Sequence, residues 1–224
     1  MAYIAIAIDG PAGAGKSTIA QQVAGALEFI YVDTGALYRA VALFALRSNI
    51  PYTDEEALVS QLGEVRVELG YREGRQLIFL GGQDVTGDIR GPEMGLVASD
   101  ISAFPCVRSF LLGLQREMAA KHNVIMDGRD IGTVVLPQAQ LKIFLTATPE
   151  DRAIRRYKEF VKNGSAISYD QVLGDIKRRD ANDMGRAIAP LKPAPDAVIL
   201  DTTGNEFEQS VEMVLKIIRE RGLV

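Results

Sequence analysis

The sequence has very few residues of the kinds that form disulfides or bind transition metals. Its 224 residues include one cysteine, Cys106, and one histidine, His122. A single cysteine permits no internal disulfide, and a single histidine excludes the zinc sites that require several Cys or His ligands. A reducing compartment, the cytoplasm, is therefore expected, and His122 is expected to be a solvated residue at the end of a helix.

A large charge excess and long apolar runs are also lacking. The formal net charge is -4, which argues against a protein whose main task is to coat nucleic acid. The apolar start of the chain has no basic flank and ends at Asp9, and no uncharged stretch reaches the roughly 18 residues of a membrane helix. We therefore expect no signal peptide, no membrane or nucleic-acid partner, and a monomer.

Short apolar segments instead alternate with helical patterns along the chain. The predicted strands cover residues 3–8, 30–32, 124–126, 141–145 and 197–200. The predicted helices cover about 16–27, 34–48, 54–62, 92–103, 105–121, 168–182 and 206–221, and a further helix begins at 149. Residues 127–136 are predicted as a loop. Five strands separated by helices predict an α/β fold with a parallel five-stranded sheet covered on both faces.

The hydrophobic period changes to two after the third predicted helix. Val65, Val67 and Leu69 alternate with polar residues, turn residues follow at 72–74, and 76–80 is apolar again. This pattern predicts a hairpin, with a further short segment near Val85. We expect one domain, with a core of 1–62 and 91–224 and a small antiparallel insertion at about 65–90. Thr53 with Glu56, and Ser168 with Gln171, are predicted capping boxes (S/T-x-x-E/Q).

A glycine-rich segment between the first strand and the first helix has the pattern G-x-x-x-x-G-K-[ST]. In this context the pattern predicts a phosphate cradle for ATP, because glycines let backbone N–H groups turn toward phosphate oxygens at a helix N-terminus. The Lys is expected to bridge the β and γ phosphates, and the Ser hydroxyl to ligate Mg²⁺. The predicted ATP-binding residues are Gly10, Pro11, Ala12, Gly13, Ala14, Gly15, Lys16, Ser17 and Thr18.

Asp127 directly follows the apolar segment 124–126. An Asp at the end of a parallel strand beside the cradle points at the site, so Asp127 is a second candidate for holding Mg²⁺. The alternative is that it caps the strand or accepts hydrogen bonds from loop amides.

The cradle and the parallel sheet together predict a fold of the P-loop NTPase type. Four classes of protein carry such a cradle. A GTPase would need an N-K-x-D motif, which is missing, and the D-x-x-G at Asp84–Gly87 falls in the predicted hairpin. A transporter ATPase would need L-S-G-G-Q, and Leu80–Gln83 lacks the Ser. A non-catalytic nucleotide-binding module and a small-molecule kinase remain.

The arginines favour the kinase. Residues 150–190 contain 9 Lys or Arg against 7 acids, and Arg152, Arg155 and Arg156 share one helical face by their spacing. Guanidinium groups neutralise and align the charge of phosphoryl transfer, whereas any single one could instead belong to a solvated ion-paired face. The segment at about 151–164 is expected to close as a lid, with Gly164–Ser165 as its hinge. The predicted catalytic residues are Lys16, Arg129, Arg152, Arg156 and Arg186.

Several motifs carry a resemblance that covers essentially the whole chain. They are Asp9–Ser17, Asp33–Arg39, Phe104–Arg108, Asp127–Thr133, Arg179–Asp180 with Asp183 and Arg186, and Ala189–Leu191. Together they resemble the nucleoside monophosphate kinases, and specifically the bacterial-type cytidylate kinase family. The family more often has Ser at the position of Thr34, but the hydroxyl group is kept.

The resemblance implies transfer of a phosphoryl group from ATP to CMP or dCMP, with Mg²⁺. It implies an acceptor-phosphate site formed by Thr34, Arg39 and Arg129, a ribose site formed by Arg179 and Asp183, and a further phosphate contact from Arg186.

The resemblance also implies that Ser99, Arg108 and Asp130 recognise cytosine. A carboxylate can accept from the cytosine amino group while an arginine donates to the ring acceptors. Uracil would leave the carboxylate without a donor, which should cost about 1 to 3 kcal/mol. A kinase of another small metabolite and the non-catalytic module are the remaining alternatives.

Overall fold

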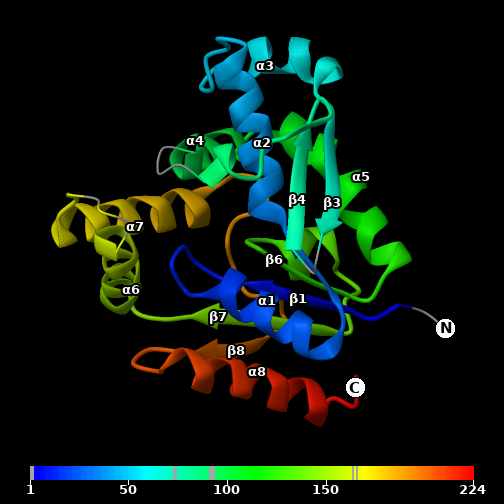
Figure 1. Ribbon diagram of the computed structural model, residues 1–224, viewed down its shortest axis with the longest axis vertical. Coiled ribbons are helices and arrows are strands. Elements are labelled where there is room, and N and C mark those ends of the chain that lie inside the picture. Colours follow the sequence, from blue (N-terminus) through cyan, green and yellow to red (C-terminus); the bar gives the residue numbers. More distant parts are fainter. Residues whose placement is uncertain (1–2, 73–74, 91–93, 163, 165) are drawn as a thin grey trace.

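A five-stranded parallel sheet forms the centre of the protein, as the strand pattern predicted. The computed structural model describes residues 3–72, 75–90, 94–162, 164 and 166–224 (Figure 1). The strand order is β2-β6-β1-β7-β8, and every neighbouring pair is parallel. The strands are β1 (Ala5–Asp9), β2 (Ile30–Asp33), β6 (Val124–Gly128), β7 (Leu141–Thr146) and β8 (Val198–Asp201).

Both faces of the central strand β1 are buried, which explains its unbroken apolar sequence. Ile6 and Ile8 point to the face covered by α1 (Lys16–Leu27) and α8 (Phe207–Glu220). Ala5 and Ala7 point to the opposite face, where α5 (Pro105–Lys121) packs. The red helix α8 lies beside β8 at the bottom of the molecule (Figure 1). Helices therefore cover the sheet on both sides.

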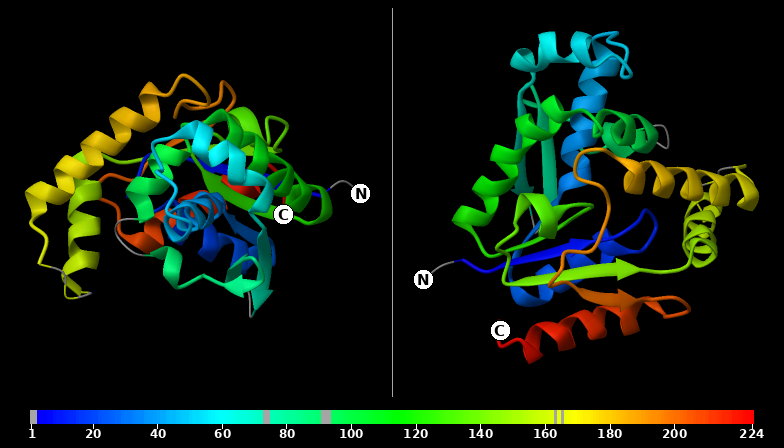
Figure 2. Two further views of the ribbon diagram at one scale, coloured as in Figure 1. Left: turned by 90° about the horizontal axis from the view of Figure 1, so that it is seen from above. Right: turned by 180° about the vertical axis from the view of Figure 1, so that it is seen from behind.

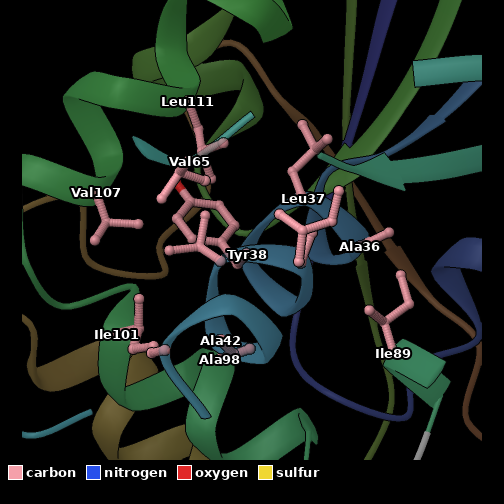
Figure 3. Close-up of a cluster of buried hydrophobic side chains, with 14 of the residues drawn as sticks. Ala36, Leu37, Tyr38, Ala42, Val65, Ile89, Ala98, Ile101, Val107 and Leu111 are labelled. Atoms are coloured by element: carbon pink, nitrogen blue, oxygen red, sulfur yellow. The ribbon is translucent and has the colours of Figure 1, made fainter. Parts of the chain in front are cut away.

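A second core lies above the carboxyl ends of β2 and β6. It joins α2 (Thr34–Arg47), α3 (Glu55–Gln61) and α4 (Met94–Ile101) to α5 and to a small antiparallel sheet. Figure 3 shows side chains of α2, α4 and α5 in this core. That sheet consists of β3 (Val67–Arg72), β4 (Arg75–Leu80) and β5 (Gln83–Asp84), which confirms the predicted antiparallel element. Short 3₁₀ turns lie at Leu62–Glu64 and Asp88–Arg90. This core carries the elements that form one end of the cleft described below.

Helices α6 (Pro149–Lys162) and α7 (Tyr169–Gly185) form a hairpin that projects from the sheet (Figures 1 and 2). It has a small core of its own around Ala153, Val172 and Ile176. The capping box of Ser168 and Gln171 at the start of α7 is confirmed. The hairpin hangs over the carboxyl side of the sheet and bears several of the predicted arginines.

Two local predictions were wrong. Asp54, and not Thr53, caps α3, because its carboxylate accepts from the backbone N–H of Ala57 at 3.0 Å. The predicted loop 127–136 contains a single turn of π-helix at Ile131–Val135, which a carboxylate distant in sequence holds in place. The helix start predicted at residue 92, the hairpin turn at 73–74 and the hinge residue 165 lie outside the described residues.

The described helices were also compared with the length and composition of a membrane span. None of them alone is long and apolar enough to cross a bilayer. Only α4 and α5 taken together reach that length and composition, and they are bent by 101° relative to each other.

Candidate active site

A cleft of about 360 Å³ opens at the carboxyl ends of β1, β2 and β6. Nine basic and five acidic side chains line it, in a chain whose net charge is -4. The cleft is therefore the part of the molecule best suited to polyanions. The predicted site residues that line it are Ala12, Gly13, Gly15, Lys16, Ser17, Thr18, Thr34, Arg39, Ser99, Arg108, Asp127, Arg129, Asp130, Arg156, Arg179, Asp183 and Arg186.

The phosphate loop forms one end of the cleft. Gly13 and Gly15 have left-handed φ values of 76° and 83°, and a Cβ atom at Gly10 would lie 1.9 Å from the carbonyl oxygen of Leu145. These positions therefore require glycine. Within the described chain no side chain caps the N-terminus of α1, so its first amides remain available to an anion.

Lys16 brings a buried cation to the loop. Its Nζ donates to the carbonyl oxygen of Pro11 at 2.8 Å. Burial, and then the charge of Arg129, lowers the pKa of Lys16 to about 7. A bound phosphate would reverse this effect, so the lysine is placed to respond to an anion.

Two oxygen-bearing side chains lie side by side next to the loop. Ser17 Oγ donates to Asp127 Oδ2 at 2.8 Å, and the Tyr31 hydroxyl donates to Asp127 Oδ1 at 2.9 Å. Burial, and then Asp33, raises the pKa of Asp127 to about 6, although the charge of Lys16 and the hydrogen bonds from Ser17 and Tyr31 oppose this. A hydroxyl and a carboxylate are ligands that suit Mg²⁺, so these residues fit the ion.

Mg²⁺ would need further ligands from phosphate and water. Among the described residues, no group of three or more His, Cys, Asp and Glu side chains could hold a metal by itself.

On the strand next to Asp127, Asp33 holds two arginines. Its Oδ2 lies 2.8 Å from Arg39 Nη2 and 3.5 Å from Arg90 Nη1. Its Oδ1 caps α2 by accepting from the N–H of Ala36. The side-chain amide of Gln76, on β4, accepts from the Asp33 N–H at 2.7 Å and donates to its carbonyl at 3.3 Å. The small sheet thus fixes the residue that orients Arg39 and Arg90.

Asp183 has the same role on α7. Arg129 Nε donates to Asp183 Oδ2 at 2.7 Å, Arg186 donates to its Oδ1, and Ser99 Oγ donates to Oδ1 at 3.3 Å. Burial alone would raise the pKa of Asp183, but the charges of Arg129, Arg186 and Arg179 outweigh burial and lower it. The carboxylate is therefore ionised and orients the arginines that surround it.

Arg108 and Asp130, the predicted cytosine contacts, pair with each other. The Arg108 guanidinium donates to the Asp130 carboxylate, and its Nη1 donates to the Ser102 carbonyl at 3.1 Å. The guanidinium carbon also lies 5.6 Å from the ring centre of Tyr38. Both residues are buried and border the cleft, so they present a donor and an acceptor side by side.

Two further arginines of the cleft, Arg179 and Arg156, are cations whose charge is less well compensated by their surroundings. Burial, and then repulsion from Arg129, lowers the pKa of Arg179 to about 9, and its buried Nε has no hydrogen-bond partner among the described residues. Burial also lowers the pKa of Arg156, whose guanidinium lies 5.1 Å from the ring of Phe160. An incoming anion would stabilise both cations.

The structure does not place Arg152 in the cleft, where Lys16, Arg129, Arg156 and Arg186, the other predicted catalytic residues, lie. It is 3% exposed and lies behind the phosphate loop. Its Nε donates to the Ala147 carbonyl at 2.9 Å, its Nη1 to the Ala12 carbonyl at 2.9 Å, and its Nη2 to Asp180 Oδ2 at 2.6 Å. All three guanidinium nitrogens are engaged, so Arg152 supports the loop from behind. Gly10, Pro11 and Ala14 also do not line the cleft.

Other residues that line the cleft were not among the predicted site residues. They are Asp33, Gly35, Tyr38, Arg90, Ala98, Ser102, Gly128, Arg155 and Glu159. The position of Asp33 before a helix is a local signal that could have found it, and Arg155 belongs to the noted arginine pattern. Arg90 and Ser102 have no local signal, because only the packing of the second core brings them to the cleft.

Comparisons with known proteins agree with this geometry. The sequence model of one family, cytidylate kinase, matches residues 6–220. A cytidylate kinase of Caldicellulosiruptor bescii is 50% identical over 217 residues, which cover 97% of this chain and 96% of the relative. A cytidylate kinase of Desulfitobacterium hafniense is 50% identical over 216 residues, which cover 96% and 93%. The crystal structure of an uncharacterized protein from Eubacterium ventriosum has a TM-score of 0.53 at 11% identity and covers 97% of this chain and 98% of its own; this likeness concerns the fold alone.

Proposed function

Since this chain belongs to the cytidylate kinase family, we propose that it transfers the γ-phosphoryl group of ATP to CMP or dCMP, forming ADP and CDP or dCDP. One observation carries the proposal. A phosphate loop and a buried arginine–aspartate pair suited to a cytosine edge border the same cleft, with arginines between them. ATP would occupy the loop, and the monophosphate would occupy the end that contains Asp33, Asp130 and Asp183.

The donor end acts through the loop amides and Lys16. The amides at the start of α1 and the Lys16 ammonium would bind the β and γ phosphates. Ser17 and Asp127 would hold Mg²⁺ together with phosphate oxygens. The ion supplies positive charge that offsets the charge of the transferred group.

The acceptor phosphate would bind among arginines that carboxylates already orient. Arg39 is held by Asp33, and Arg129 and Arg186 are held by Asp183. A phosphate oxygen can take up guanidinium N–H groups that these carboxylates leave free, so little reorganisation is needed on binding. Thr34 donates its hydroxyl to the Asp127 carbonyl at 2.8 Å and borders the same space.

Asp130 and Arg108 would read the base, with Ser99 beside them. Asp130 would accept from the cytosine amino group, and Arg108 would donate to the ring acceptors. Arg179 and Asp183 would contact the ribose. No protein base is required, because the acceptor phosphate is itself the nucleophile and catalysis consists of alignment and charge neutralisation.

The hairpin of α6 and α7 would act as a lid. Arg155 and Arg156 on α6 line the cleft, so closure of this segment would bring positive charge to the phosphates and exclude water. A monomeric state, a cytoplasmic location and the lack of nucleic-acid or membrane partners remain predictions. Sedimentation of the purified protein with and without nucleotides tests the first of them.

ADP release with Mg-ATP and a panel of CMP, dCMP, UMP and AMP tests the proposed activity. CMP and dCMP should be phosphorylated, with UMP slower by the equivalent of about 1 to 3 kcal/mol in kcat/KM. Asp130→Asn should reduce the preference for CMP over UMP and spare ATP binding. Equal use of all four acceptors would refute the base assignment. ATP binding without transfer to any acceptor would favour the non-catalytic module, and full activity of Asp130→Ala would favour another small acceptor.

A further inference from the structure

The carboxylate of Asp9 joins two segments that are far apart in the sequence. Asp9 is the last residue of β1, directly precedes the phosphate loop and is 4% exposed. Its Oδ1 accepts from the backbone N–H of Ile131 at 2.8 Å, and its Oδ2 accepts from that of Gly132 at 2.7 Å. These amides begin the π-helical turn Ile131–Val135. A buried anion thus holds the N-terminus of that turn.

The turn in question carries the proposed base-reading residue. Asp130 is the residue before the turn, and its carbonyl accepts from the N–H groups of Val134 at 2.8 Å and Val135 at 3.2 Å. These bonds lie within the segment and would move with it. The two bonds to Asp9 come from another element, so they fix the segment relative to the sheet.

The other side of Asp9 is equally constrained. A Cβ atom at Gly10 would lie 1.9 Å from the carbonyl oxygen of Leu145, so the start of the phosphate loop lies directly against β7. A Cβ atom at Gly132 would lie 3.1 Å from Lys142 Cδ and 3.4 Å from Asp9 Oδ2, so the anchored turn also packs tightly. One residue therefore connects the donor end of the cleft to the acceptor end through close contacts.

We propose that Asp9 is a positioning residue that fixes Asp130 and the adjacent Arg129 relative to the phosphate loop, and that it thereby contributes to the choice of acceptor base. The inference rests on the proposed function, because it concerns the same site. Arg116 on α5 holds the far end of the turn through the carbonyl groups of Val134 and Val135, so loss of the anchor should free the start of the turn, next to Asp130. A displacement of about 1 Å in a positioning element is enough to cost on the order of 100-fold in rate.

Two substitutions of Asp9 remove its hydrogen bonds to the turn, one in part and the other completely. Asp9→Asn keeps one acceptor oxygen and places an NH₂ group against the other amide, whereas Asp9→Ala removes both acceptors. We expect kcat/KM for CMP to fall about 10-fold to 100-fold, more for Ala than for Asn. UMP should lose less, so the preference for CMP over UMP falls, and the Kd of ATP should stay within about twofold of the wild-type value.

Val214→Ala is the matched control. Val214 is fully buried in α8, which packs on the sheet away from the acceptor end, so this variant lowers stability without touching the anchor. It should leave the CMP to UMP preference unchanged. Hydrogen exchange gives a readout besides activity: the Ile131 and Gly132 amides should lose protection in the Asp9 variants and keep it in the control.

The outcomes separate this inference from the proposed function. A wild-type protein that does not phosphorylate CMP refutes the function. An active wild type whose Asp9 variants keep the CMP to UMP preference and the KM for CMP refutes the role of Asp9. A loss that Val214→Ala reproduces at equal stability also refutes it. Where Asp9→Ala does not fold, Asp9→Asn decides by the same criteria.

Discussion

The proposed donor and acceptor ends of the cleft present positive charge by different means. At the donor end, one continuous segment, Gly10–Ser17, uses backbone amides and a single buried cation, Lys16. At the acceptor end, side chains from α2, α4, α5, α7 and the segment after β6 converge, and carboxylates hold most of the arginines. The loop segment itself therefore has one cationic side chain, whereas the acceptor end distributes its charge over several.

Lys16→Met should give the largest effect and tests this contrast directly. Turnover should fall by about 10³-fold or more, because no other cation lies in the loop segment itself. Stability should not fall, since burial already disfavours the charged form of Lys16. The measurements are kcat with Mg-ATP and CMP, and urea unfolding.

Arg39→Met is the matched change at the acceptor end. It should lower kcat/KM for CMP only about 10-fold to 100-fold, because Arg90, Arg129 and Arg186 remain. Equal losses in Lys16→Met and Arg39→Met would contradict the contrast between the two ends.

Arg152→Leu tests the assignment of this residue to the support of the loop. The variant leaves Asp180 buried without a partner and should lower the free energy of unfolding by about 3 to 5 kcal/mol. Arg152→Leu combined with Asp180→Leu should recover much of this loss. Urea unfolding measures both, and kcat of the folded fraction should change little.

Lys177→Met is the control for that experiment. Lys177 pairs with Glu150 at 3.1 Å between the same two helices, but both side chains are more than half exposed. Its loss should cost less than about 1 kcal/mol. A stable but inactive Arg152→Leu protein would instead support the original prediction of a catalytic role.

A pH series probes Asp9, which joins the two ends. Burial raises the pKa of Asp9 to about 6. The hydrogen bonds from the Gly132 and Ile131 amides oppose burial, and of the nearby charges Asp130 raises the pKa and Lys16 lowers it. The side chain of Lys142 packs beside Gly132. Between about pH 4 and 6 the folded state binds more protons than the unfolded state, so this group lowers the free energy of unfolding as the pH rises. As the pH rises over this window, the free energy of unfolding of the wild type, measured with urea, should fall by up to about 3 kcal/mol relative to that of Asp9→Asn. A constant difference would refute the raised pKa.

Arg179→Met should give the smallest effect, of opposite sign. The buried cation is repelled by Arg129, so its removal should stabilise the free protein by about 1 kcal/mol while activity falls. Arg178→Met is the neighbouring control, because Arg178 is exposed and pairs with Asp175 at 2.9 Å. The free energy of unfolding of this variant should differ from that of the wild type by less than about 0.5 kcal/mol. Thermal unfolding with and without CMP is the measurement. A less stable Arg179→Met protein would show that the arginine is already well matched.

Much of the fold was predictable because its signals are local. The helix α1 was predicted with its observed bounds, since glycines and an apolar stripe define both ends, and α5 likewise begins at Pro105 and ends at Lys121. The π-helical turn at Ile131–Val135 was missed, because its anchor, Asp9, lies more than 120 residues earlier in the chain. Local patterns report what neighbours in the chain can do, and they contain no information on such partners.

Sequence alone determined the strand-loop-helix that would bind phosphate, because all of its requirements lie within consecutive residues. Only the tertiary structure decided which arginines face the cleft. Arg152 and Arg156 lie one turn apart on α6, and their spacing predicts one shared face. Arg152 donates to Ala12 and Asp180, from other parts of the chain, and therefore lies behind the loop, whereas Arg156 borders the cleft. The burial of a charge depends on partners supplied by the whole fold, and for that reason it cannot be inferred from spacing.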